Sequence, residues 1–260
     1  MCIRDRINII ISYLNKDMET FIFVHDENII LDYINVNKFS KIKNLKYVFV
    51  GNNGTDNIKH LDNVIICRDL PNNLENYPKL TSFTGWYALW KNNLIKSDIV
   101  NLFEYDVNLS SDIEDHINFN FSLGYNVIGY VPILISEHNF IGEDHWISYL
   151  RSSLEKNHNI NLNNQIYSLP HDKIITVTSN HSFTVNAFNE YMEWIEPMID
   201  DIKISNFSGH EVERSISIFY LLKNISYVFL PNLLYHFQFD SHETQGIGRN
   251  KFEAQYKDLL

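Results

Sequence analysis

The chain has 260 residues, of which 45% are hydrophobic and 14% aromatic, enough to bury a sizeable core. Its formal net charge is -11, with 21 Lys and Arg against 32 Asp and Glu. This acidic balance argues against a general nucleic-acid binder, which needs a basic surface, but leaves room for a local basic pocket. The two cysteines, Cys2 and Cys67, form neither a disulfide framework nor a cysteine metal cluster.

The same features indicate a compartment. Few cysteines fit a reducing cytoplasm. No apolar run approaches the roughly 20 residues that cross a bilayer, so no transmembrane segment is expected. We therefore expect a cytoplasmic protein, with peripheral contact at the inner face of the membrane left open.

The first residues need separate treatment. Met1–Arg6 resembles the translation of a sequencing-library adapter, and residues 1–17 are expected to be an artefactual or non-core extension. Met18 is a candidate start because a convincing strand follows it. Residues 18–260 are predicted to form a single domain.

Apolar runs and helical periodicity alternate along the first half of the chain. Short apolar runs bounded by turn signals predict strands, and apolar residues every three to four positions predict helices. Strands that alternate with helices predict an α/β fold with a parallel sheet and right-handed crossovers. In chain order the elements are a strand at 21–26, a helix at 29–39, a strand at 45–50, a short helix at 56–61, a strand at 63–67, a loop at 68–79 and a helix from Thr81 or Ser82 to Leu94.

The stretch from Ile99 to Ser110 is where chemistry is expected. Its apolar start predicts a strand buried on both faces, and Glu104 and Asp106 follow it two residues apart. Ligands of open α/β sheets lie beyond the carboxyl ends of the strands. A regular strand would place both carboxylates on one face. The alternative is that these acids only end a strand and begin the next helix.

The second half is less regular. Pro132 predicts a bent or edge strand at 126–135. The other elements are a helix at 111–119, a helix at 146–154, a strand at 173–178, a helix at 188–199, a helix at 211–222 and a last core strand at 226–230.

Two motifs resemble a known family. Glu104-Tyr105-Asp106 resembles the DXD element of nucleotide-sugar glycosyltransferases of the GT-A fold, although the first acid there is more often Asp. Residues 79–92 resemble the Tyr- and Trp-rich helix before the acid strand in enzymes that build bacterial surface polysaccharides. The resemblance implies a GT-A-like, Rossmann-like, mostly parallel sheet flanked by helices, with a smaller C-terminal acceptor-side portion. The donor half is expected at 18–135 and the acceptor half at 136–260.

The resemblance also implies roles on the donor side. In that family the last acid of the motif binds a divalent metal and the first lies near the sugar nucleotide. Asp106 is therefore predicted to ligate the metal and Glu104 to contact the nucleotide. Lys79, Thr81 and Trp86 are predicted as further donor contacts, although the spacing of Trp86 also fits a core residue.

The acceptor side rests on two later segments. Gly209–Ser215 resembles the segment in which a Glu serves the acceptor, so Glu211 is predicted as the base, and Glu213 as a structural partner of Arg214. A base is needed because a hydroxyl is a poor nucleophile until it loses its proton. A C-terminal His often completes the metal shell in this family, and His236 is preferred to His242. Carboxylate, diphosphate and imidazole ligands suit Mn²⁺ or Mg²⁺.

Together these features predict an enzyme that moves a sugar from a nucleotide-diphosphate donor to a saccharide or lipid-linked acceptor, with a metal ion. Three alternatives stay open: a nucleotidyltransferase, a glycoside hydrolase that uses a carboxylate pair, and a non-enzymatic binding module. A nucleotidyltransferase would usually carry a Gly-rich basic loop after its first strand, and residues 21–28 have none.

Overall fold

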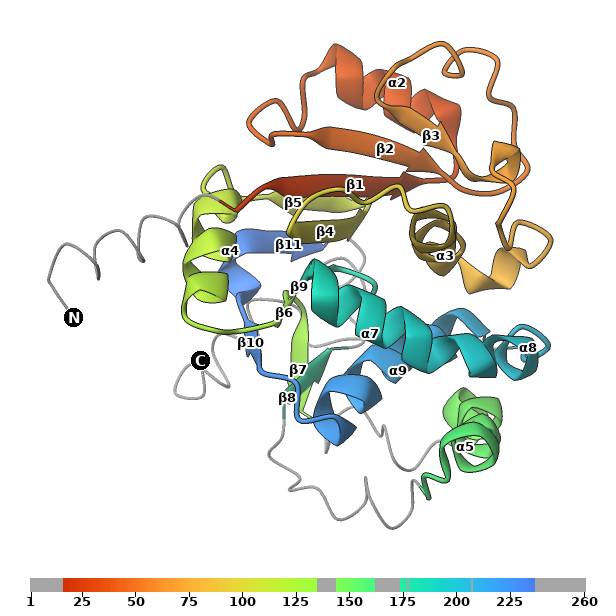
Figure 1. Cartoon of the computed structure of the whole chain (residues 1–260). Helices are drawn as coiled ribbons and strands as arrows, with labels where there is room; N and C mark the ends of the chain where they lie inside the picture. Colours follow the sequence, from red (N-terminus) through yellow and green to blue (C-terminus); the bar gives the residue numbers. More distant parts are fainter. Residues whose placement is uncertain (1–15, 135–143, 162–173, 177, 207, 237–260) are drawn as a thin grey trace, which may run out of the picture.

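A seven-stranded sheet forms the centre of the molecule (Figure 1). The computed structural model describes residues 16–134, 144–161, 174–176, 178–206 and 208–236. The strand order is β10-β6-β9-β4-β1-β2-β3; β9 runs antiparallel to β4 and β6, and the other neighbours pair in parallel. The strands are β1 (Met18–Val24), β2 (Leu45–Phe49), β3 (Val64–Ile66), β4 (Ile99–Glu104), β6 (Val127–Gly129), β9 (His181–Thr184) and β10 (Tyr227–Phe229).

Helices cover both faces of this sheet, which confirms the predicted α/β architecture. One hydrophobic cluster joins the sheet to α3, α5, α7, α8 and α9, and a second joins it to α2 and α4. The helices are α2 (Glu27–Asn35), α3 (Phe83–Lys91), α4 (Ile113–Ser122), α5 (Asp144–His158), α7 (Val185–Ile195), α8 (Ile199–Ile202) and α9 (Ser208–Leu222), with short 3₁₀ turns η1 (Cys67–Asp69), η2 (Pro78–Leu80), η3 (Glu196–Met198) and η4 (Pro231–Leu233).

The two central strands explain why these residues form a sheet. Every residue of β1 is buried, and so is β4 up to Glu104, because helices cover both of their faces. Side chains of a strand alternate between faces. Phe21 and Leu102 therefore join the cluster under α3 and α7, whereas Ile22 and Phe103 join the cluster under α2 and α4.

The antiparallel strand β9 was not predicted. No strand is predicted between the strand at 173–178 and the helix at 188–199, but residues 181–184 pair with both β4 and β6. Here Ser182 and Tyr130 share a buried hydrogen bond of 2.7 Å between their hydroxyl groups. Strand β9 belongs to the predicted acceptor half and β4 to the donor half, so the two halves share one sheet.

Three other predicted elements differ from the structure. The strand predicted at 126–135 is two strands, β6 in the large sheet and β7 (Pro132–Leu134), which pairs with β8 (Ile174–Thr176). Residues 56–61 form turns instead of a helix. Helix α9 begins at Ser208, three residues before the predicted start, which changes the setting of Glu211.

The boundary predicted at residue 17 falls inside the hydrogen-bonded structure. Met18 is the first residue of β1 and is buried. The carbonyl oxygen of Asp17 accepts hydrogen bonds of 3.1 Å from the backbone N–H groups of Asp98 and Ile99. Asp17 therefore helps to hold the start of β4; residues 1–15 lie outside the described part of the chain.

The residues after the acid strand form a small antiparallel pair. Strand β5 (Val107–Leu109) pairs with β11 (Leu234–His236), with His236 in register with Val107. The backbone of His236 is thereby placed next to the residue that follows Asp106. Two segments far apart in the sequence meet at the carboxyl end of β4.

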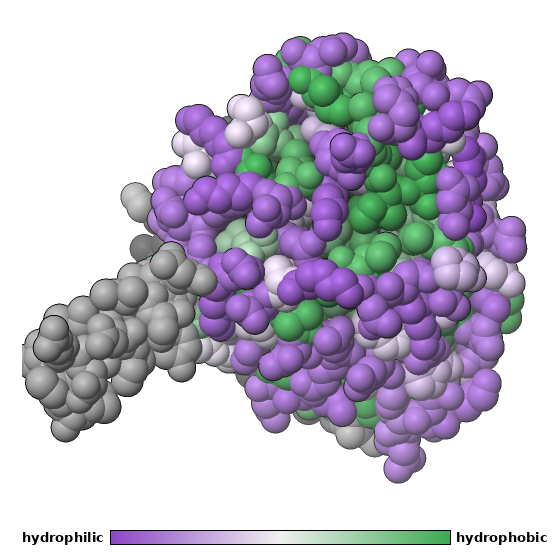
Figure 2. Space-filling view, turned by 45° about the horizontal axis from the view of Figure 1, so that its top comes forward, coloured by the Kyte–Doolittle hydropathy of each residue, from purple (hydrophilic) through white to green (hydrophobic). Residues whose placement is uncertain are grey.

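The visible surface is mostly polar. In the space-filling view hydrophilic residues cover most of this face, and a smaller group of hydrophobic residues shows between them (Figure 2). Among the described residues, no helix combines the length and apolar character that a membrane span requires.

A histidine is buried in the described part of the core without a hydrogen-bond partner. His181, on β9, is 0% exposed, and neither ring nitrogen has a hydrogen-bond partner among the described residues. Its ring stacks on Phe183 and meets Trp86 edge to face. Burial lowers the pKa of His181 to about 3, because a charged imidazolium would lose its hydration there.

We predict that His181→Leu reduces the loss of stability in acid. Between pH 6.5 and about 3 the unfolded His181 binds a proton that the folded one does not, so acid favours unfolding. Over most of that window, His181 should lower the free energy of unfolding by about 1.4 kcal/mol for each unit by which the pH falls. Urea unfolding at pH 6.5 and pH 5 measures it, with His60→Leu on the exposed surface as control. An equally steep acid loss in His181→Leu would contradict the prediction.

Candidate active site

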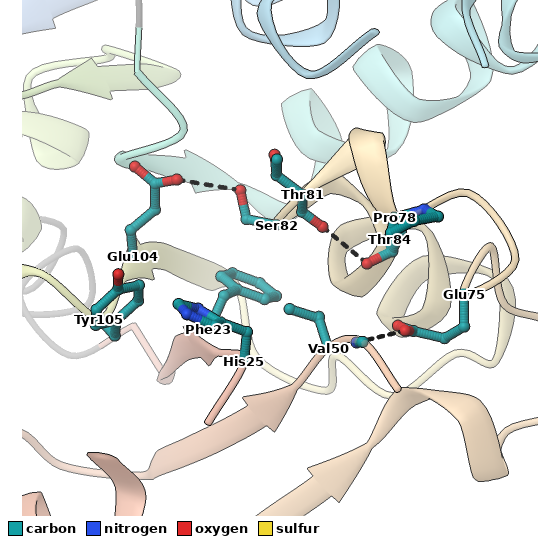
Figure 3. Close-up of a pocket in the computed structure, with 11 residues that line it drawn as sticks. Phe23, His25, Val50, Glu75, Pro78, Thr81, Ser82, Thr84, Glu104 and Tyr105 are labelled. Carbon is teal, nitrogen blue, oxygen red and sulfur yellow. Dashed lines mark hydrogen bonds between the residues drawn. The ribbon is translucent and has the colours of Figure 1, made fainter. Parts of the chain in front are cut away.

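A cavity of about 320 Å³ opens at the carboxyl ends of β1, β2 and β4 (Figure 3). This is the rim where open α/β sheets bind ligands, because strands that end together leave a crevice. The loop between β3 and α3 and the start of α3 close its other side. Its lining comprises Phe23, His25, Val50, Gly51, Glu75, Pro78, Thr81, Ser82, Thr84, Glu104 and Tyr105.

Thr81 lies at the edge of this cavity in an uncommon backbone conformation. Its φ is 53°, which a β-branched residue rarely adopts. The Thr81 carbonyl accepts a 2.8 Å hydrogen bond from the hydroxyl of Thr84, which helps to fix the turn. Such local strain is common at ligand sites. Thr81, which the sequence predicts as a donor contact, is one of the residues that line the cavity.

Glu104 lies at one end of the cavity and is held by residues from two other elements. Its backbone N–H donates to the side-chain oxygen of Asn180 at 2.8 Å, and the Asn180 amide donates to the carboxylate at 3.3 Å. A longer contact of 3.4 Å comes from the hydroxyl of Ser82. Asn180 is 0% exposed and directly precedes β9. Asn180 was not among the residues predicted for the site, although its position just after a predicted strand is a weak signal.

Helix α9 brings the second half of the chain against the turn at Thr81, which lines this cavity. Gly209, in its first turn, packs against η2: a Cβ on this glycine would lie 2.8 Å from the carbonyl oxygen of Lys79 and 3.3 Å from a methyl carbon of Thr81. Glycine is therefore required by the close approach of two backbones. The first turn of α9 is held directly against the Thr81 turn.

Glu213, on α9, lies close enough to Glu104 for the charges of the two carboxylates to interact. Glu211 is 0% exposed, whereas the side chain of Glu213 is 19% exposed. Burial and the charge of Glu104 raise the pKa of Glu213 to about 8, against the opposing effect of Arg214. A carboxyl group that titrates near neutral pH beside a residue of the cavity lining is a candidate acid or base. The predicted pairing of Glu213 with Arg214 is present, at 3.4 Å.

Asp106 has a different environment from Glu104. It sits in a two-residue turn between β4 and β5, so the strand does not continue regularly and the two acids need not share a face. Asp106 is not in the cavity lining. Its charge acts on Lys38, whose pKa falls to about 8 through burial while Asp106 opposes the fall. The nearby Tyr33 donates a 2.7 Å hydrogen bond to the carbonyl oxygen of Tyr105.

The remaining predicted residues fall outside the cavity lining. Lys79 is exposed and donates a 3.0 Å hydrogen bond to Asn206. Trp86 is 1% exposed and packs among Phe23, Phe183 and other rings, so in this conformation it cannot touch a ligand in the cavity. His236 is placed only by its backbone, next to Val107.

The residues fit a metal ion only with help from a substrate. Among the described residues, no three His, Cys, Asp or Glu side chains are grouped to hold one. Mg²⁺ in nucleotide sites commonly takes one or two carboxylates and completes its shell with phosphate oxygens and water. Glu104 can supply such a carboxylate. None of the residues in the cavity lining is Lys or Arg, so a diphosphate there would need another cation.

Comparison with known proteins shows what this fold is shared with. No family model matches the sequence, and a search of curated proteins finds no match. Among solved structures, the chain is similar to the apo structure of the bifunctional glycosyltransferase WbbM, with a TM-score of 0.60 and 13% sequence identity. The match covers 84% of this chain and 45% of that one, so the chain spans less than half of its neighbour. The chain therefore has an α/β fold found in a glycosyltransferase.

We predict that Gly209→Ala separates α9 from the cavity wall. The added Cβ would meet the Lys79 carbonyl, and relieving this contact should lower the free energy of unfolding by about 1–3 kcal/mol. Chemical denaturation measures the loss. Gly54→Ala is the matched control, because the nearest atom to its Cβ would be at 3.9 Å. Equal free energies of unfolding for the two variants would contradict the prediction, because they would mean that η2 can move away from an added Cβ without loss of stability.

Proposed function

We propose that this protein is a GT-A-type glycosyltransferase, which moves a sugar from a nucleotide-diphosphate donor to a saccharide or lipid-linked acceptor. The observation that carries the proposal is that Glu104, from the donor half, lines the cavity and lies close enough to Glu213, from the acceptor half, for the two charges to interact. The fold shared with a glycosyltransferase supports the reaction class. Carboxylates from both halves let one site hold a donor and activate an acceptor.

The donor is proposed to lie along the cavity with its diphosphate toward Glu104. The cavity has a polar end at Glu104 and Ser82 and apolar walls at Phe23, Val50 and Pro78 (Figure 3). This distribution suits a molecule with a flat heterocycle at one end and a charged group at the other. Thr81 and Ser82 would contact the part between them.

A divalent cation, Mn²⁺ or Mg²⁺, is proposed to bind between Glu104 and the diphosphate. When bound, it would neutralise the charge that develops on the departing diphosphate. Glu104 is the stronger candidate ligand because it lines the cavity, whereas the charge of Asp106 is already countered by Lys38. Asn180 keeps the Glu104 carboxylate in place through its amide. His236, adjacent to the acid turn through β11, remains a candidate for the same shell.

The acceptor hydroxyl is proposed to lose its proton to Glu213. The carboxylate of Glu213 is partly exposed, whereas the fully buried Glu211 would require a change of conformation to reach an acceptor. Its raised pKa makes it a stronger base than an ordinary carboxylate. The contact between Gly209 and the Thr81 turn holds the first turn of α9 against the segment that lines the cavity.

The direct test is incubation of the purified chain with a panel of nucleotide sugars and Mn²⁺, with and without saccharide acceptors. Release of nucleoside diphosphate and a mass increase of the acceptor by one sugar are expected. Hydrolysis of aryl glycosides without use of any nucleotide sugar would instead favour a glycoside hydrolase. Failure to bind any nucleoside diphosphate with Mn²⁺ would contradict the proposal.

We predict that Glu104→Gln lowers the affinity for a nucleoside diphosphate plus Mn²⁺ by about tenfold or more, because a neutral amide is a poor ligand for a hard cation. Asp106→Asn should keep most of the Mn²⁺-dependent affinity. Calorimetric titration with and without Mn²⁺ measures both. A larger loss of affinity in Asp106→Asn than in Glu104→Gln would assign the metal to Asp106, as the motif resemblance implies.

We predict that Glu213→Gln keeps donor binding but lowers the transfer rate by about a hundredfold or more, the usual contribution of a general base. Glu211→Gln, two positions earlier on the helix, should retain most of the transfer rate if it folds. Rates at saturating donor measure both. Full activity of Glu213→Gln would remove this base and favour a mechanism in which no protein group takes the acceptor proton.

A further inference from the structure

The end of the cavity away from Glu104 holds a second carboxylate, Glu75, which the donor and acceptor roles above do not use (Figure 3). Glu75 is 5% exposed. Its Oε2 accepts a short hydrogen bond from the backbone N–H of Gly51. Its Oε1 is buried and has no hydrogen-bond partner among the described residues.

The nearest candidate donors are already engaged. The hydroxyl of Thr84 lies close enough to Glu75 to lower its pKa, but its single proton is donated to the Thr81 carbonyl at 2.8 Å. The guanidinium of Arg68 bonds to the carbonyl of Asn53 at 2.7 Å and to the hydroxyl of Thr55, and acts on Glu75 only through its charge. A buried carboxylate oxygen without a donor is unfavourable, and it calls for a ligand that brings an N–H or O–H group.

The walls beside Glu75 favour a flat ring as that ligand. Phe23, Val50 and Pro78 provide apolar surface. The rings of His25 and Tyr105 meet edge to face at 4.9 Å and form the far wall. A heterocycle with a donor on its edge matches both the apolar walls and the single acceptor.

We propose that Glu75 selects the base of the nucleotide donor by accepting a hydrogen bond from a ring N–H. Uracil, thymine and guanine carry such a group, at N3 of the pyrimidines and N1 of guanine. Cytosine and adenine carry a bare ring nitrogen at the same place, which would face the carboxylate oxygen as a second acceptor. This inference rests on the proposed function, in that the cavity takes the donor nucleotide.

The test compares UDP, dTDP, GDP, CDP and ADP by calorimetric titration in the presence of Mn²⁺. UDP, dTDP or GDP should bind at least about tenfold more tightly than CDP and ADP, since two facing acceptors leave buried groups unpaired. The wild-type chain alone can refute the inference, so the test does not depend on a variant that folds.

Glu75→Gln sharpens the test. The amide oxygen can still accept from Gly51 N–H, which turns the amide N–H₂ toward the cavity as a donor. The order of affinities should then shift toward CDP or ADP. Asp69→Asn is the control, because Asp69 is an exposed neighbouring carboxylate outside the cavity lining and should leave the order unchanged.

The outcomes separate the two proposals. A wild-type preference for CDP or ADP, equal binding of all five, or an unchanged order in a folded Glu75→Gln would overturn the role of Glu75 and leave the glycosyltransferase proposal standing. Absence of binding by all five nucleotides would overturn both.

Discussion

The site depends on the hydrogen bonds between Asn180 and Glu104. Asn180 accepts from the backbone of Glu104 and donates to its carboxylate, so one buried amide fixes both the end of β4 and the direction of its acid. Because Asn180 directly precedes β9, the ladder that β9 forms with β4 holds the amide in register. The geometry of the cavity therefore follows from how the sheet is assembled.

The electrostatics of the site follow from its lining. Glu75 and Glu104 line the cavity, and the charge of Glu104 acts on Glu213, while none of the lining residues is Lys or Arg. Such a lining repels a bare diphosphate and attracts cations and N–H donors. A ligand that fits this lining must therefore bring a cation and an N–H donor, and a metal-bound nucleotide would bring both. Lys38 balances Asp106 outside this lining, which keeps the acid turn from adding a further unpaired charge.

The sequence was sufficient to predict the α/β architecture, except for β9, and to place Glu104 at the end of a buried strand. Strand β4 is a continuous apolar run that ends in acids, a pattern typical of a strand buried between two helical layers. Strand β9 was missed because it has only four residues, with His, Ser and Thr among them, and its stability comes from its neighbours.

The choice between Glu211 and Glu213 depends on helix phase: residues two apart on a helix point in different directions, and the start of α9 could not be located from the sequence. Nothing in the loop sequence around Glu75 indicated a buried carboxylate, because its burial is produced by residues far away in the chain.

The position of β9 also has a consequence for the order in which the protein acquires structure during synthesis. Strands β1, β2, β3 and β4 lie within the first 104 residues and pair with one another in parallel. On the ribosome, which releases the chain from its N-terminus, these strands emerge long before residue 180. Until β9 arrives, one edge of β4 and the backbone N–H of Glu104 lack their partners. The nascent chain can thus hold a folded nucleus with an exposed strand edge, an intermediate prone to wrong pairing, and translation of the next 80 or so residues sets how long that edge stays open.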